Sequence, residues 1–335
     1  NTFTISNLYF QLSINQDNEF TKVGIFASID NGASIENIKI VYGLSQIEIS
    51  YLNSTTFSFG VLAGENRSTN IVGLQVQAKS ENDIIYINDN GLSTISQDRT
   101  AIVGGIFGLN TGRVNNSSAE VYIDSNFKEL VPVAGGFVGE NRGGRIVGNE
   151  DSNSAVFSRL EVQSEKSSPN IAVGGLAGKN SGFVTNMDIE TIINSANISK
   201  VGGIVGFNEG TLENLYVVPK IVAKDYVGGA VGITSRNSKQ SNVYVEFASS
   251  LDNLTAISAE KYVGGFAGFL LGETTFSYVN SFVNLKLIGR NSALQAGTFY
   301  GDIVADTFVG GFAGQIGETG SKSRVQSCYA KVKLS

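Results

Sequence analysis

The sequence predicts an all-β protein, a right-handed parallel β-solenoid of about nine coils. One phrase, Val-Gly-Gly followed by two apolar residues, recurs nine times at intervals of 26 to 46 residues. Its copies contain strand-forming residues and show no helical period. A unit repeated from end to end is typical of stacked architectures rather than of an active site. The copies begin at Val23, Phe59, Val103, Ala134, Val173, Val201, Val227, Val263 and Val309.

Composition narrows the functional classes. With 41% hydrophobic and 16% charged residues, the 335-residue chain can fold around a continuous core. The net charge is −6, and Lys and Arg are scattered singly, so we expect no nucleic-acid partner. One cysteine, Cys328, and no histidine exclude an internal disulfide, a Cys/His zinc cluster and a histidine-based catalytic triad within this chain. No apolar run reaches the roughly 20 residues of a transmembrane helix.

The paired glycines predict the first corner of each repeat. Side chains alternate along a strand, so a buried residue at position 1 and another at position 4 require a bend between them. Glycines permit positive φ and close backbone approach at that point. A flat strand covered on both faces is the alternative interpretation. The large residues at position 4 are Phe26, Leu62, Ile106, Phe137, Leu176, Ile204, Phe266 and Phe312.

A second signature, apolar-x-Asn-apolar-x-apolar, predicts another corner. It occurs at residues 35–40, 184–189 and 212–217. Asn suits a corner because it enters the left-handed region and hydrogen-bonds locally. Stacked repeats would align these asparagines, so we expect an inward ladder of side-chain amides at Asn37, Asn186 and Asn214.

The shortest repeats have room for about three strands, and a right-handed path follows the general crossover preference. Nine coils at about 4.8 Å would give a rod on the order of 40 Å long. A β-propeller is the alternative, but its blades need longer repeats. Residues 84–87 and 160–163 are candidate third strands. The longer segments 80–100, 149–170 and 289–306 are candidate binding loops.

The phrase at Val173–Asn186 and Val201–Asn214 resembles the GLUG-motif repeats of bacterial cell-surface and secreted proteins. Such repeats occur in adhesins and in non-catalytic regions of immunoglobulin-A peptidases. The resemblance covers most of residues 23 to 330. It departs at Val23, where Ile25 replaces the second glycine, and at Val227, where Ile233-Thr234-Ser235 replaces the Gly-x-Asn turn. The resemblance implies an extracellular or cell-surface setting and supplies no catalytic residue.

Enzymatic alternatives depend on a few polar residues. Residues 174–180 lack the spacing of a phosphate-binding loop. A carbohydrate-active β-helix would use paired carboxylates, and the candidates are Asp188, Asp225, Asp302 and Asp306. The acidic tracts 88–91 and 149–153 offer oxygen ligands for calcium but read better as turns. We therefore expect no catalytic, cofactor-binding or metal-ligating residue.

Two further patterns concern the surface. Asn-x-Ser/Thr glycosylation acceptors, which matter only for a eukaryotic secreted source, occur at Asn53, Asn66, Asn115, Asn116, Asn197 and Asn253. Most aromatic residues fall in the apolar register and are expected in the core. Phe299 and Tyr300, in a long segment, are the aromatic candidates for binding.

These patterns predict one continuous solenoid over residues 1–335. Neither end shows the capping helix typical of terminal repeats, so we expect an excerpt of a longer chain. The expected function is a non-enzymatic structural or adhesive segment of a surface or secreted protein. Its expected partners are a surface protein, a glycan or neighbouring copies joined end to end. The alternatives are an accessory region of a secreted peptidase and a carbohydrate-active β-helix.

Overall fold

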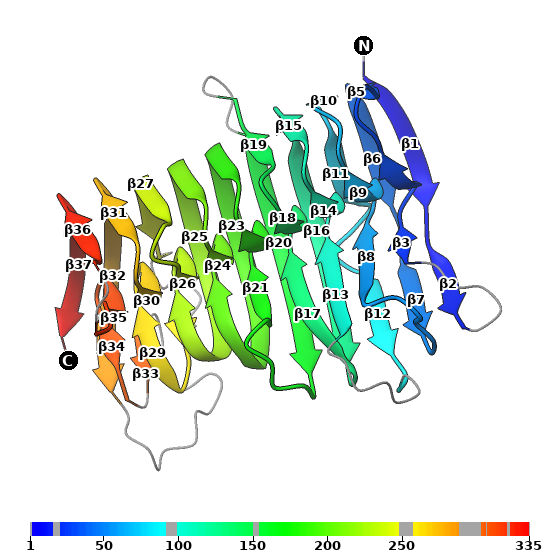
Figure 1. The fold of residues 1–335 in the computed structure, drawn as a ribbon. Coiled ribbons are helices and arrows are strands. Elements are labelled where there is room, and N and C mark those ends of the chain that lie inside the picture. The colour runs from blue at the N-terminus through cyan, green and yellow to red at the C-terminus, as the bar shows by residue number, and fades with distance from the viewer. Residues whose placement is uncertain are drawn as a thin grey trace.

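A computed structural model shows an all-β chain (Figure 1). It describes residues 2–15, 21–91, 99–149, 154–247, 257–287, 303–305, 307–319 and 322–334. Every strand pairing in these residues is parallel, and none of them forms a helix suited to crossing a bilayer. The strands stand side by side in a row, with the two chain ends at opposite ends of that row. The prediction of an all-β, parallel architecture is therefore confirmed.

The strands form five sets, each built from equivalent segments of successive repeats. The first set precedes the glycine corner: β3 (Lys22–Val23), β8 (Thr56–Gly60), β13 (Arg99–Gly104), β17 (Leu130–Gly135), β21 (Ala172–Gly174), β29 (Lys261–Gly264) and β34 (Val309–Gly310). The second follows it: β4 (Phe26–Ile29), β9 (Ala63–Asn66), β14 (Phe107–Asn110), β18 (Val138–Asn141), β22 (Ala177–Asn180), β24 (Val205–Asn208), β26 (Val231–Thr234), β30 (Ala267–Leu270) and β35 (Ala313–Ile316).

The other three sets flank the second corner. Before it lie β5 (Ser34–Glu36), β10 (Asn70–Val72), β15 (Arg113–Asn115), β19 (Arg145–Val147), β31 (Glu273–Thr275) and β36 (Arg324–Gln326). After it lie β1 (Phe3–Leu8), β6 (Ile38–Tyr42), β11 (Gln75–Ala78), β16 (Ser118–Phe127), β20 (Ser154–Ser164), β32 (Tyr278–Leu287) and β37 (Tyr329–Leu334). One strand, β27 (Lys239–Glu246), begins before this corner and continues past it. Third strands are β2 (Gln11–Ile14), β7 (Ser45–Ile49), β12 (Ile85–Asp89), β28 (Ile257–Ser258) and β33 (Ile303–Ala305). Two long strands, β23 (Phe183–Gly202) and β25 (Thr211–Gly228), run through several sets without a break.

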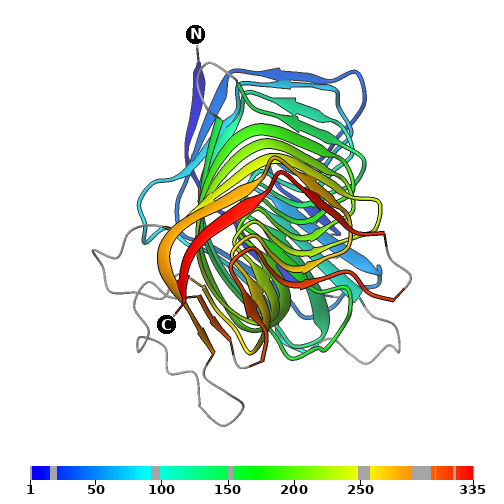
Figure 2. The same ribbon diagram turned by 90° about the vertical axis from the view of Figure 1, so that its left-hand side faces the viewer.

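The repeat alignment predicted from sequence is confirmed by the register. Each repeat start pairs with the next one along the chain, from Val23 with Phe59 to Val263 with Val309. The second set forms a sheet of nine described strands, one from each copy of the phrase. Viewed along the row, successive repeats follow a similar curved path one behind another (Figure 2). A buried apolar cluster extends from Phe10 to Val279 between these strands.

The bend at the paired glycines is confirmed, and close packing explains why glycine occupies it. Val173 and Leu176 are both fully buried on either side of the bend. Neither Gly174 nor Gly175 has positive φ, so conformational freedom does not explain them. A Cβ on Gly175 would lie 2.2 Å from the carbonyl oxygen of Gly203 and 2.7 Å from Cβ of Thr191. No side chain fits between these neighbours.

The first repeat departs from one prediction. Phe26 was expected in the core at position 4, but its side chain is 44% exposed. The register pairs Phe26 with Ala63, which is position 5 of its own repeat. The first copy lacks one glycine, so the chain reaches the second strand one residue early and Ile25 packs against the core instead.

The second corner is confirmed as left-handed, but its amides do not turn inward. Asn186 and Asn214 have φ of 57° and 51°. Asn37, Asn214 and Asn242 are exposed, and Asn242 Nδ2 donates to Asn214 Oδ1 at the surface at 2.8 Å. The expectation of an inward ladder at these positions is therefore wrong, because the corner turns their side chains outward.

Buried amides form a row at the other asparagine, eight residues into the phrase. In this amide row each Nδ2 donates to the next Oδ1, with N–O distances of 2.7 to 2.8 Å, across Asn66, Asn110, Asn141, Asn180 and Asn208. All five are 0 or 1% exposed. A glycan acceptor at Asn66 is therefore excluded in the folded chain.

Segments expected as loops contain strands where the structure describes them. The third-strand predictions are confirmed, since β12 covers most of residues 84–87 and β20 includes residues 160–163. Within the segment 149–170, β20 pairs with β16 and β23 in register. Residues 92–98, 150–153 and 288–302 lie outside the described residues, and so do Phe299 and Tyr300.

Candidate binding groove

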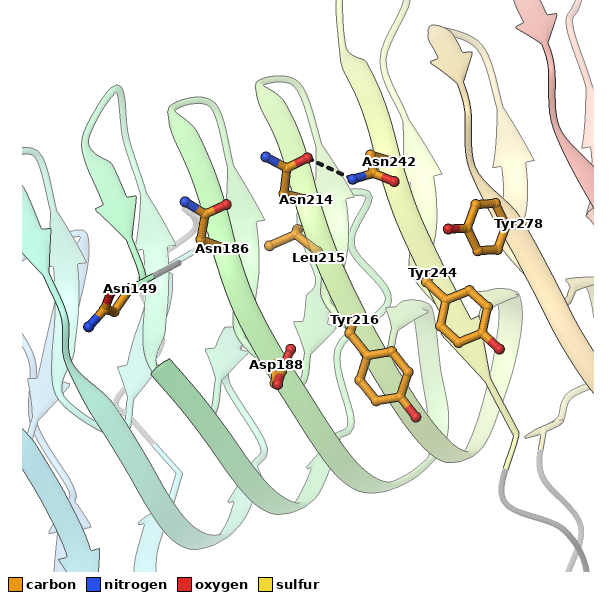
Figure 3. Close-up of a pocket in the computed structure, with 9 residues that line it drawn as sticks. All are labelled: Asn149, Asn186, Asp188, Asn214, Leu215, Tyr216, Asn242, Tyr244 and Tyr278. Carbon is orange, nitrogen blue, oxygen red and sulfur yellow. Dashed lines mark hydrogen bonds between the residues drawn. The ribbon is translucent and has the colours of Figure 1, made fainter. Parts of the chain in front are cut away.

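A surface groove follows the second corner across β23, β25, β27 and β32. It encloses about 660 Å³ and is lined by Asn149, Asn186, Asp188, Asn214, Leu215, Tyr216, Asn242, Tyr244 and Tyr278. We call it the Asn–Tyr groove. Figure 3 shows its amides near the corner and its aromatic rings farther along the strands. Its position follows from local structure, because the residue two places beyond each corner asparagine points outward between two buried apolar residues.

Tyrosines line the floor of the groove in a row that runs across the strands. The rings of Tyr216 and Tyr244 stack with centroids 5.3 Å apart and planes 17° apart. Tyr244 meets Tyr278 edge-on at 4.9 Å, and Tyr278 stacks on Tyr329 at 5.1 Å. Parallel register fixes this row, because the four residues pair in order along adjacent strands. We call these residues the tyrosine row.

Asp188 ends the tyrosine row at Tyr216, its partner in register. A smaller hollow of about 190 Å³ adjoins this end and is lined in part by Phe157, Asp188, Glu190 and Tyr216. Tyr216 therefore borders open space on the side of Asp188 and a ring on the side of Tyr244. Of the described residues that line the Asn–Tyr groove, Asp188 is the one with a carboxylate side chain.

The hydroxyl of Tyr216 is fixed by a carboxylate on the neighbouring strand. It donates to Oε2 of Glu246 at 2.6 Å. Burial, followed by this hydrogen bond and the negative charge of Glu246, raises the pKa of Tyr216 above its ordinary value. The phenol consequently stays protonated at neutral pH and its ring is held in place beside Asp188.

The predicted acidic candidates do not converge. Asp188 lies in the groove, in the first part of β23, whereas Asp225 lies near the end of β25. Ser199 Oγ donates to Asp225 Oδ2 at 3.4 Å, and Lys261 Nζ lies 3.9 Å from Oδ1. Asp302 and Asp306 lie outside the described residues. The structure thus brings no pair of these carboxylates together at one site in the part of the chain it describes.

The first acidic tract, residues 88–91, was expected as a turn, but Asn88 and Asp89 belong to the end of β12. Asp89 is 1% exposed, and its carboxylate accepts hydrogen bonds of 2.8 to 3.2 Å from the backbone N–H groups of Lys128, Glu129 and Leu130. These bonds hold the connection between β16 and β17. Among the described residues, no group of three or more Cys, Asp or Glu side chains is arranged to hold a metal ion. Most of the second tract, 149–153, lies outside those residues.

A second groove, of about 270 Å³, is charged and internally paired. Glu65 accepts from Lys22 Nζ at 2.5 Å and from Arg67 through two nitrogens at 2.8 and 2.9 Å. Burial alone would raise the pKa of Glu65, but hydrogen bonds from Arg67 and Lys22 outweigh it and lower that pKa. The carboxylate is saturated by its own neighbours, so this groove is a structural ion cluster.

The tyrosine row was missed from sequence because aromatic residues were assigned to the core or to long segments. A usable signal exists at the outward position that follows the second corner. Tyrosine occupies that position in Tyr216, Tyr244, Tyr278 and Tyr329, each two residues after a left-handed corner residue. An aromatic residue repeated at an outward position favours a surface role over core packing.

The chain was also compared with known proteins. Searches against family models, curated proteins and solved structures find no match for this chain.

Proposed function

We propose that the chain is a right-handed parallel β-solenoid of about nine coils that serves as a non-enzymatic, structural or adhesive segment. The supporting observation is the unbroken register of the nine repeat starts, from Val23 to Val309. Such stacking gives a stiff body whose outer face repeats at the strand spacing. A surface of this kind is suited to presenting side chains to an extended partner.

The proposed setting is the cell surface or the extracellular space, in line with the resemblance of the phrase to GLUG repeats. A dense row of buried hydrogen bonds through Asn110, Asn141 and Asn180 supports a segment that resists unfolding outside the cell. The Asn–Tyr groove offers an attachment surface on the same body. We therefore favour adhesion over a purely spacing role.

Binding to intact surfaces tests this function. Fluorescently labelled chain is incubated with host-derived cells and with an array of purified surface proteins and glycans. Saturable binding to at least one of them supports adhesion. Absence of binding, together with end-to-end assembly seen by electron microscopy, would replace adhesion with a structural role. Antibody labelling of intact source cells tests the proposed location, and labelling only after permeabilisation would contradict it.

The carboxylate of Asp188 lies beside Tyr216 in an open groove, and this observation favours a carbohydrate-active enzyme as the alternative function. Glycoside cleavage ordinarily requires two carboxyl groups on either side of the bond. Incubation with polysaccharides, followed by a reducing-end assay, separates the functions. Product formation that is lost in Asp188→Asn would establish the enzyme and refute the non-enzymatic proposal.

A further inference from the structure

We infer that the Asn–Tyr groove binds a neutral polysaccharide that lies along the row of repeats, with one sugar ring stacked on Tyr216 and its hydroxyls on Asp188. This inference deepens the proposed adhesive function and rests on it. It assigns a chemical class of ligand to a groove built from named side chains.

First, one face of the Tyr216 ring is covered by another ring, and the other face borders a hollow. Within the tyrosine row, Tyr244 stacks on one face of Tyr216 at 5.3 Å. On the opposite side the register places Asp188 rather than another ring, and the hollow beside it borders both residues. The π face of an aromatic ring next to a hydrogen-bonding carboxylate matches a sugar, which presents C–H groups on its apolar face and hydroxyl groups elsewhere.

The second step concerns the amides. Asn186, Asn214 and Asn242 stand at successive corners and line the groove (Figure 3). Each side-chain amide has a donor and an acceptor, as each sugar hydroxyl does. Their left-handed backbone holds the amides on the outer side of the corner. Amides repeated on adjacent strands, about 4.8 Å apart, favour a ligand that extends across the strands.

The third step excludes strand addition by a peptide at this surface. The backbone N–H and C=O groups of β23, β25 and β27 are used in pairing between repeats on both sides. A peptide bound by strand addition needs an unpaired edge. In the groove only side chains are offered, which suits a ligand recognised through hydroxyl groups.

The fourth step concerns charge. Among the described lining residues the groove has a carboxylate and neither lysine nor arginine. A polyanion, such as a nucleic acid or an acidic glycan, would lie against the carboxylate of Asp188 in a groove whose described lining residues include no lysine or arginine to attract it. A neutral polyhydroxylated chain avoids this repulsion, and its hydroxyls can donate to the carboxylate in charge-assisted hydrogen bonds.

The experiment begins with an array of neutral, acidic and amino-containing glycans, probed with the whole chain. The neutral polysaccharide that gives the strongest signal is then cast into native gels, and retardation gives a Kd for each variant. We expect Tyr216→Ala and Asp188→Ala each to raise that Kd about tenfold or more, because each removes a main contact. Tyr262→Ala is the matched control, since Tyr262 stacks between Tyr226 and Phe308 outside the groove. It should leave the Kd unchanged.

Several results would overturn the inference. These are binding restricted to acidic glycans, the absence of any neutral ligand on the array, and equal loss of affinity in the Tyr262→Ala control. Circular dichroism melts of all variants show that each is folded at the assay temperature. If a surface protein is bound and glycans are not, adhesion stands while the polysaccharide inference fails. If the retained polysaccharide is cleaved, the binding inference stands while the non-enzymatic function fails.

Discussion

Asn141 donates its side-chain amide to Oδ1 of Asn180 at a distance of 2.7 Å, with both residues buried. Asn110 donates in turn to Asn141 at 2.8 Å. The amide row thus saturates polar groups that would otherwise be unpaired in the interior. Beyond each end of the row the register places other residues at the same position, Ile29 before Asn66 and Thr234 after Asn208.

Substituting the central amide should be strongly destabilising. Asn141→Leu removes the acceptor of Asn110 Nδ2 and the donor to Asn180 Oδ1 in a buried site, and leaves these two atoms only longer hydrogen bonds to Gly112 O at 3.4 Å and from Gly182 N at 3.2 Å. Each unsatisfied group costs about 1 to 3 kcal/mol, so we expect a loss of about 3 kcal/mol in the free energy of unfolding. Urea denaturation measures it. Asn194→Leu, at an exposed position in β23, is the matched control and should change stability little.

If backbone contacts alone stabilise the repeats at the amide row, Asn141→Leu should give a different result. In that case Asn141→Leu would lower the denaturation midpoint no more than the control does. That outcome would remove the amides from the account of stability.

The second corner contains one residue that fits it poorly. Phe276 has φ of 47° and is 59% exposed. A bulky side chain in the left-handed region costs roughly 1 to 2 kcal/mol, whereas asparagine tolerates it better. Phe276→Asn should therefore raise stability by about 1 kcal/mol, measured as a shift of the urea midpoint. The reverse substitution at the equivalent corner, Asn242→Phe, should lower it. An unchanged midpoint in both variants would show that backbone conformation does not limit stability there.

Much of the fold follows from sequence because the repeat phrase fixes register. The start of each copy pairs with the next, and both predicted corners occur where apolar periodicity changes. The place of the buried amides was not predictable in the same way. Some repeats have asparagines at both positions, as in Asn180 and Asn186, and sequence does not distinguish the one that turns inward.

The groove was missed for a related reason. Its residues are single outward positions in different repeats, and their proximity depends on register across strands. Asp188 was singled out from sequence as an acid, but its neighbour Tyr216 lies on the next strand. Only the pairing of β23 with β25 joins them into one site. The charged cluster at Glu65 likewise combines Lys22 from the previous repeat.

Two glycines should differ sharply in the stability that is lost when alanine replaces them. Gly175→Ala would place a Cβ 2.2 Å from the oxygen of Gly203, and backbone must move to admit it. We expect a loss of several kcal/mol or failure to fold, as overpacking in a dense interior is costly. Gly143 has φ of 69° and open space around it, so Gly143→Ala should cost only about 1 kcal/mol.

Thermal denaturation monitored by circular dichroism compares the two glycine variants. Equal losses would indicate that conformational preference, rather than close packing, explains both positions. A larger loss at Gly175 is expected because its surroundings are full, although its backbone conformation suits alanine better than that of Gly143.

The charged cluster predicts a defined pH dependence of stability. The pKa of Glu65 lies below its ordinary value of 4.5, because hydrogen bonds from Arg67 and Lys22 favour the ionised form more than burial opposes it. A carboxyl whose pKa is lower in the folded state stabilises the fold above its unfolded pKa. That contribution is lost as pH falls from about 4.5 through the folded pKa.

Glu65→Gln should therefore reduce stability at pH 7, and the difference from the parent chain should shrink steadily below pH 4.5. Urea midpoints of both proteins across this range measure the difference, with the exposed Glu190→Gln as a control that should show little effect at any pH. If the difference in stability between Glu65→Gln and the parent chain stays constant as the pH falls, the Glu65 side chain stabilises the fold through packing. Only the charge of its carboxylate titrates in this window.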